Sequence, residues 1–587
     1  MKKHYETHVE DTDKLISVAG PVLDYKSWYE QYRKLMEEQA QRKYGLYTPT
    51  SEGDDDDFPS IPGITARYSA LGLTNEQMAA NPVWKNLTGN GHDLQMKNFS
   101  WKGMSGVGGY VGDFSKWVNN RDTTEIGITK SNSKVIIDVK VSQGSGKNIV
   151  FISKSNLGIS NNVTIKITST YPEGVMKFAN SASNKYLKLP SNGIITLQDN
   201  PEYTSNEMHL HLASADLGQI TIEQLPLYPG ALVFDGVDDY GTCNNFPILT
   251  KEKGYTVVAL RQWITRGEIA QGLVSNVKNW LKDGAFLLEY RNIQAEHLNK
   301  PISFGAIGSE MDLPHILTYQ TSKSYNGVSI TTGNFEGTDV LHVGKLAPTN
   351  VGTCINAAIW ELVFLDHDAT EEELTKIKDY FVKTYPWLFP DQAWTVTGKT
   401  NEDEDRATIA NITGNGNDLV LSNFGFAEGS GYNEEGEYAS YLVTDGVDDK
   451  IVSSVFGMGK DFTIVGDWKF IDNKKSGTGL VKGSSFYIYN TMIGLDLYIN
   501  SGSVTNSFNG IKSINAVCSD GRVYDPNWDE ILANTGNVVG SGGALEVSSS
   551  GGRFDRMAFK NLVIYPRILS KDDCIKAYNY LQTLKAK

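Results

Sequence analysis

The sequence predicts a mainly β protein in which one antiparallel sandwich occurs twice and a further sandwich is inserted into the first copy. Three phrases that recur in the same order support this prediction. LTGNGHDLQMKNF at 87–99 recurs as ITGNGNDLVLSNF at 412–424, and ALVFDGVDDY at 231–240 recurs as YLVTDGVDDK at 441–450. The third phrase, WELVFLDHDATEEELTKIKDY, recurs as KNLVIYPRILSKDDCIKAYNY. Such self-similarity indicates a duplicated structural unit.

The offsets between the copies locate the insertion. The first phrase recurs 325 residues later, whereas the second and third recur after 210 and 200 residues. The difference of 115 residues between the first two offsets is the length of a small domain. The expected parts are an N-terminal segment at 1–62, a first sandwich split over 63–119 and 229–390, an inserted sandwich at 120–228, and a second sandwich at 391–587.

The first 62 residues contain a stretch of helical periodicity followed by the acidic run Asp54–Asp57, which indicates a solvated linker. Ser27 and Glu30 can form a capping box, in which each side chain satisfies a backbone N–H at the start of a helix. A short amphipathic helix cannot bury its aromatic face alone, so it must pack on a domain of this chain or on another chain, and we favour attachment to another chain. The residues expected to make this attachment are Trp28, Tyr29, Tyr32, Leu35 and Met36.

From Gly63 onward, short apolar runs alternate with turns rich in Gly, Asn, Asp and Ser, which is typical of antiparallel sandwiches. The insert has a strand rhythm of its own, for example in KVIIDVKVSQ, NVTIKITST and ITIEQLP. Helical periodicity returns at the end of each copy, where Thr370 with Glu373 and Ser570 with Asp573 should cap short helices. The segment between the copies, TYPWLFPDQAW, is short and contains prolines, so we expect the two sandwiches to touch.

Composition and charge argue against several classes of protein. The 54 basic and 69 acidic residues give a net charge of −15, and Lys and Arg form no cluster, so we expect neither nucleic acid nor a membrane surface as a partner. No 18-residue apolar run is present and no apolar segment follows Lys2 and Lys3, so we expect no membrane span and no secretory signal. The four cysteines do not correspond between the copies, which indicates free thiols.

Three motifs carry a family resemblance. They are the FDGVDDY and TDGVDD loops at 234–240 and 444–449, the GNGHD and GNGND turns at 89–93 and 414–418, and YPRILS at 565–570. On these motifs the duplicated unit resembles the laminin-G-like, concanavalin A-like jelly-roll family. The resemblance implies two stacked antiparallel sheets in each copy, a fold that often binds carbohydrate or protein. Copy one departs from the pattern with FLDHDA at 364–369, so that edge need not be equivalent.

The DGVDD loops are the first candidate site. Glycine with positive φ and aspartates that cap backbone N–H groups suit a tight hairpin, which is the interpretation we favour. The same carboxylates could bind calcium, although their spacing matches no known calcium loop. The residues concerned are Asp235, Asp238 and Asp239 in copy one and Asp445, Asp448 and Asp449 in copy two. The GNG turns are interpreted in the same structural way.

The insert contains the second candidate site. Glu207, His209 and His211 alternate with apolar residues, so a strand would place the two groups on opposite faces. A His-x-His pair on one face can bind a transition metal. We favour the simpler interpretation that these polar residues form a solvent-exposed face.

No catalytic motif is found: the sequence lacks HExxH, GxSxG, a P-loop and the strand-borne carboxylate set of a glycosidase. We therefore expect no enzymatic activity and no cofactor. Sugar binding needs only exposed aromatic rings and a few amides. The tryptophans that could serve, most of which should be core residues, are Trp84, Trp101, Trp117, Trp263, Trp394, Trp468 and Trp528.

Lectin-like sandwiches, an attachment helix and the lack of a secretory signal together resemble fibre or tail proteins of bacteriophages, in particular of the crAss-like group. The resemblance implies a virion protein, made in the host cytoplasm, that docks on other virion proteins through residues 1–60. Its sandwiches would bind host-surface polysaccharide, and repeated weak sites would gain strength together. We also expect a homo-oligomer and favour a trimer. Two alternatives stay open: a decoration or collar protein that binds no sugar, and a bacterial surface lectin.

Overall fold

Six antiparallel sheets of five to eight strands form the framework of the described chain, which confirms the predicted mainly β fold. Residues 57–587 form one compact unit. The computed structural model describes these residues apart from 143–146, 180–184, 198–205, 214–216, 266–270, 285–286, 291–316, 330–335, 346–353, 428, 436–437, 472–477, 483–485, 492–493, 500–507, 510–512, 533–541, 548, 551–552, 555 and 587. The expected attachment residues Trp28, Tyr29, Tyr32, Leu35 and Met36 lie outside the described residues.

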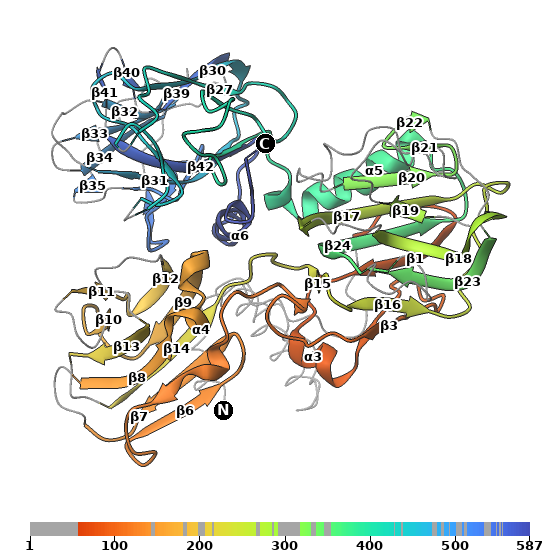
Figure 1. Cartoon of the computed structure of the whole chain (residues 1–587), viewed down its shortest axis with the longest axis horizontal. Coiled ribbons are helices and arrows are strands. Elements are labelled where there is room, and N and C mark those ends of the chain that lie inside the picture. Colours follow the sequence, from red (N-terminus) through yellow and green to blue (C-terminus); the bar gives the residue numbers. More distant parts are fainter. Residues whose placement is uncertain are drawn as a thin grey trace, which may run out of the picture. The chain divides into compact units, whose positions relative to one another are not determined.

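Two sheets form the first jelly roll (Figure 1). Strand β24 organises one of them, because β17 pairs along one edge while β1 and β15 share the other. This sheet contains β22 (Val328–Ser329), β21 (Ser324–Tyr325), β20 (Leu317–Thr321), β17 (Thr256–Thr265), β24 (Asn356–Leu365), β15 (Leu232–Asp235), β4 (Gly106–Val107) and β1 (Ile64–Ser69). The facing sheet contains β19 (Leu287–Tyr290), β18 (Gly272–Gly284), β23 (Glu336–Val343), β16 (Tyr240–Cys243), β3 (Leu94–Lys97) and β2 (Val83–Trp84). Apolar side chains from both sheets, such as Phe364 and Leu94, form one core.

The second jelly roll repeats this plan. Strand β42 takes the place of β24, with β31 along one edge and β25 and β29 along the other. Its sheet contains β28 (Gly431–Asn433), β29 (Tyr441–Val443), β42 (Met557–Tyr565), β31 (Thr463–Phe470), β36 (Ala516–Cys518), β37 (Arg522–Tyr524), β38 (Glu530–Leu532) and β25 (Gln392–Thr395). The facing sheet contains β26 (Thr408–Ile409), β27 (Leu419–Ser422), β30 (Lys450–Gly457), β39 (Gly542–Val547), β32 (Thr478–Lys482), β33 (Phe486–Thr491), β34 (Gly494–Ile499) and β35 (Phe508–Asn509). A separate pair is formed by β40 (Ser549–Ser550) and β41 (Arg553–Phe554).

Each jelly roll ends in the predicted capped helix. Helix α5 (Glu371–Thr384) begins with a complete capping box between Thr370 and Glu373. Helix α6 (Lys571–Leu581) begins at Ser570, whose hydroxyl oxygen accepts a hydrogen bond from the N–H of Asp573. Both caps satisfy backbone groups that would otherwise lack a partner. The shorter helices are α3 (Asn75–Ala80), α4 (Lys154–Leu157) and the 3₁₀ turns η2 (Phe114–Lys116), η3 (Ile159–Asn161) and η6 (Pro386–Leu388).

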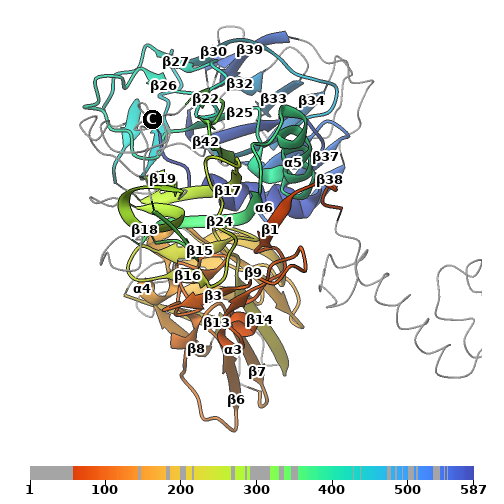
Figure 2. The same ribbon diagram turned by 90° about the vertical axis from the view of Figure 1, so that its right-hand side faces the viewer.

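The insert is a sandwich of two five-stranded sheets. Sheet D contains β11 (Tyr186–Lys188), β10 (Met176–Ala179), β13 (Glu207–Leu212), β8 (Lys147–Ser153) and β5 (Val118–Asn119). Sheet E contains β12 (Asn192–Leu197), β9 (Val163–Ser169), β14 (Gly218–Gln224), β7 (Lys134–Val139) and β6 (Ile126–Lys130). The β6–β7 hairpin is seen at the lower end of Figure 2. The sandwich starts earlier than residue 120, because Phe114 and Trp117 are fully buried in its core.

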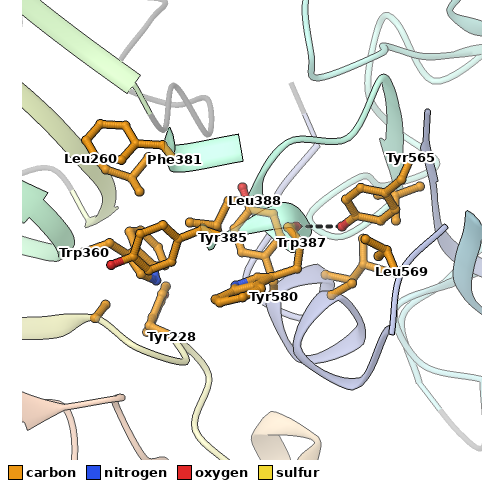
Figure 3. Packing of buried hydrophobic residues seen from close by; sticks show 14 of the residues in the cluster. Tyr228, Leu260, Trp360, Phe381, Tyr385, Trp387, Leu388, Tyr565, Leu569 and Tyr580 are labelled. Atoms are coloured by element: carbon orange, nitrogen blue, oxygen red, sulfur yellow. Dashed lines mark hydrogen bonds between the residues drawn. The ribbon is translucent and has the colours of Figure 1, made fainter. Parts of the chain in front are cut away.

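A third core contains residues of both jelly rolls and of the segment that joins them (Figure 3). Trp360 on β24 and Trp387 on η6 are both buried within it, and the Tyr565 hydroxyl at the end of β42 donates a 2.7 Å hydrogen bond to the carbonyl of Trp387. The Arg567 guanidinium donates to the carbonyl of Val382, at 3.2 Å. The expectation that the two sandwiches touch is therefore confirmed.

The terminal edges of the two copies differ, as the sequence suggested. Where copy two has Arg567, copy one has His367, whose ring nitrogens lie 3.2 Å from carboxylate oxygens of Asp366 and Glu373. His367 thus stays within its own copy, whereas Arg567 reaches the other.

The four cysteines are buried free thiols, as predicted. Within the described part of the chain, no helix combines the length and the apolar character that crossing a membrane requires.

Candidate functional site

The aspartate loop of the first jelly roll, between β15 and β16, is closed by hydrogen bonds. The N–H of Asp235 donates to Asp239 Oδ2 at 3.1 Å, and the N–H of Val237 donates to Asp235 Oδ1 at 2.8 Å. The Ser105 hydroxyl donates to Asp239 Oδ1 at 3.0 Å. Gly236 has a φ of +80°, and a Cβ there would lie 2.8 Å from the Cβ of Asn356, so the position requires glycine.

The second jelly roll repeats these bonds atom for atom. The N–H of Asp445 donates to Asp449 Oδ2 at 2.8 Å, the N–H of Val447 donates to Asp445 Oδ1 at 2.7 Å, and the Ser430 hydroxyl donates to Asp449 Oδ1 at 3.0 Å. The favoured interpretation of these segments as self-capped hairpins agrees with both sets of bonds.

The aspartate loops could hold a cation, but their hydrogen bonds do not depend on one. In each, one oxygen of each of three carboxylates lies within 4.8 Å of the others, which would suit a hard cation such as calcium. Burial, opposed by the hydrogen bonds and reinforced by the neighbouring carboxylates, raises the pKa of Asp239 to about 7 and that of Asp449 to about 6. Both oxygens of each of these two buried residues already accept hydrogen bonds from the protein.

The GNG turns are also built as turns. Gly89 and Gly91 have φ of +76° and +74°, and the Asp93 carboxylate accepts the N–H of Asn86 at 2.9 Å. In copy two, Asp418 accepts the N–H of Asn411 at 2.8 Å in the same way. The two copies share these turn residues because the backbone conformation of the turn requires them.

Strand β13 divides its side chains between two faces. Met208, Leu210 and Leu212 lie in the core of the insert, and Glu207, His209 and His211 therefore lie on the outer face of sheet D. The expectation that this outer face is simply solvent-exposed is wrong for His209, which is only 6% exposed. The Phe151 ring, with its centroid 5.5 Å from that of His209, and the Asn120 amide account for part of this burial.

The register of sheet D brings residues from five strands into two rows on this outer face. Cross-strand pairing places Tyr186, Ala179, His209, Phe151 and Val118 in one row, which we call the aromatic row. The adjacent row contains Lys188, Lys177 and His211 and is called the basic row.

Sequence reasoning identified only the two histidines of these rows. Alternation within each strand could have assigned Tyr186, Lys177 and Phe151 to one face of its own strand. The pairing of strands that are distant in sequence was needed to place these residues next to His209.

Six of the seven tryptophans considered for sugar binding are buried and cannot stack on a sugar. As expected, most are core residues: Trp84, Trp117, Trp263, Trp394, Trp468 and Trp528 are buried, and Trp101 is half-buried. Tyr186, at 46% exposure, is the aromatic side chain that stands out as exposed in the described part of the chain.

No family model and no curated protein matches the chain. Among solved structures, Trypanosoma rangeli sialidase in complex with sialic acid is 12% identical, covers 78% of this chain and 85% of its own, and superposes with a TM-score of 0.24. The binding domain of botulinum neurotoxin DC in complex with rat synaptotagmin II is 8% identical, covers 60% of this chain and 89% of its own, and has a TM-score of 0.21. Similarity at this level carries no argument about the activity or the ligand of this chain.

Proposed function

We propose that the chain is a structural protein of a bacteriophage virion, a fibre or tail appendage, which binds polysaccharide on the host surface without catalysing a reaction. The observation that carries this proposal is the duplicated jelly roll, in which the residues shared by the two copies make the same hydrogen bonds within loops. Shared residues that stabilise loops are what a repeated binding scaffold needs. An enzyme would instead require a constellation of groups left available for chemistry.

In this proposal residues 1–60 attach the chain to other virion proteins, and three copies associate. Association multiplies weak contacts to a repetitive polysaccharide and so raises the overall affinity. Light scattering on the full chain measures its mass in solution, and a value near three times 64.8 kDa is expected. A monomer at micromolar concentration would contradict this part of the proposal.

The binding itself is tested by applying the full chain to an array of bacterial surface polysaccharides, with calcium and with a chelator. Specific binding is expected, whereas a folded chain that binds none of them would contradict adhesion and favour a decoration or collar protein. Loss of binding in chelator would assign a cation to the aspartate loops. In that case Asp238→Asn with Asp448→Asn, two changes at exposed loop positions, should reproduce the effect of the chelator.

A further inference from the structure

The outer face of sheet D offers an exposed aromatic ring between polar groups. Tyr186 and Val118, at opposite ends of the aromatic row, are 46% and 42% exposed. Between them, Ala179 and His209 are 3% and 6% exposed. Tyr186, Ala179 and His209 lie on the neighbouring strands β11, β10 and β13 (Figure 1), and Val118 lies on β5, beyond β8. The row is mainly apolar, because Ala179 and Phe151 flank His209 within it, and Tyr186 is its exposed aromatic ring.

Two buried imidazole nitrogens on this face lack a hydrogen-bond partner. The Asn120 amide nitrogen lies 3.4 Å from His209 Nδ1. With this amide as the donor, Nδ1 accepts and Nε2 carries the proton. His209 Nε2 makes no hydrogen bond, although the Glu207 carboxylate lies 3.5 Å away, and His211 Nε2 is likewise buried and without a partner. A buried polar group without a partner costs about 1–3 kcal/mol, but both nitrogens are too deeply buried for a ligand on this face to reach them, so the exposed groups Tyr186 and Lys188 define the binding surface.

The basic row gives the face a local charge opposite to that of the whole chain. Lys188 is exposed, and the Lys177 ammonium lies 4.2 Å from the centre of the Tyr186 ring. The chain as a whole carries a net charge of −15. Burial, together with the nearby Lys177 and His209, lowers the pKa of His211, so its imidazole is neutral at neutral pH. The positive charge of this face therefore comes from the lysines, and the exposed Glu207 carboxylate on β13 opposes part of it.

We propose that the outer face of sheet D binds an acidic polysaccharide, with a sugar ring stacked on Tyr186 and a uronate carboxylate at Lys177 and Lys188. A pyranose ring presents an apolar face that can pack on the exposed Tyr186 ring, and a uronate carries its carboxylate on that same ring, within reach of the neighbouring lysines. This inference rests on the proposed adhesive function and names its ligand class.

The test uses the full chain and titration calorimetry with tetramers of galacturonic acid and of mannuronic acid, each beside a neutral tetramer of the same linkage. The acidic tetramers should bind more tightly, and added salt should weaken their binding. Tyr186→Ala should weaken binding at least about tenfold, and Lys177→Gln about three- to tenfold with a smaller dependence on salt. The matched controls are Leu217→Ala, an exposed apolar residue beside β14, and Lys166→Gln, an exposed lysine on β9; both should bind as the unchanged chain does.

Four outcomes are possible. Weaker binding in the two face variants, with unchanged controls and unchanged circular dichroism, supports the inference. Equal affinity for acidic and neutral tetramers, or no effect of Tyr186→Ala, overturns it. Binding of other polysaccharides on the array without binding of either uronate tetramer overturns the inference but leaves the proposed function standing. Binding of no polysaccharide at all by the folded chain overturns both.

Discussion

Replacing Glu361 by Gln should destabilise the first jelly roll strongly, because it would remove the carboxylate that a buried arginine binds through two hydrogen bonds. The Arg67 guanidinium on β1 donates to both oxygens of Glu361 on β24, at 3.0 and 3.3 Å. The hydroxyl of Tyr385 also donates to Glu361, at 2.9 Å, and Arg67 donates to the hydroxyl of Tyr380 at 2.7 Å. The two charged side chains are 5% and 0% exposed, so water cannot replace the lost partner.

The expected loss is about 3–5 kcal/mol, the usual cost of removing one member of a buried ion pair. For a domain of this size the unfolding temperature of the first jelly roll should fall by about 10 °C. Hydrogen exchange of β1, measured by mass spectrometry on the full chain, reports on this jelly roll separately from the second. The double variant Arg67→Met with Glu361→Gln removes both charges and should recover most of the loss.

The second jelly roll shows that the sandwich itself does not need these charges. The pairing of β25 with β42 matches that of β1 with β24, and it places Ala393 and Asn561 at the positions that Arg67 and Glu361 occupy in copy one. The contrary result is that Glu361→Gln alone leaves the exchange of β1 unchanged and shifts the unfolding temperature by less than about 1 °C. That result would refute the reasoning that Arg67 and Glu361 stabilise each other away from water.

Three further changes test other parts of the fold. Thr370→Ala removes the side-chain cap of α5 and should cost about 1 kcal/mol in denaturant unfolding; an unchanged midpoint would contradict the role of the cap. Burial lowers the pKa of His342 to about 4, because the folded chain favours the neutral imidazole. The free energy of unfolding should therefore decrease as the pH falls from 6.5 to about 4. Over that range the unchanged chain should lose up to about 3 kcal/mol more than His342→Gln does, and parallel stability curves would refute this. Gly344→Ala places a Cβ 2.6 Å from the Phe234 ring at a φ of +80°, whereas Gly89→Ala meets no atom within 4 Å; thermal unfolding should therefore show a much larger loss for the first, and equal losses would contradict it.

The sequence by itself determined those features of the protein that depend on local pattern and on comparison of the chain with itself. The recurring phrases identified the duplicated unit, since residues that make the same loop bonds in both copies recur in both. Short-range chemistry also determined the caps at Thr370 and Ser570, because a cap involves residues only three positions apart. The free state of the cysteines followed from their unequal positions.

Only the tertiary structure decided which residues from different strands become neighbours. Tyr186 and His209 share one row because β11, β10 and β13 pair in a particular register, and a shift of one residue would turn every side chain to the other face. The burial of His209 and the meeting of Arg67 with Glu361, 294 positions apart, have the same origin. Strand pairing over long separations is set by the packing of the whole core, so no local pattern in the sequence specifies it.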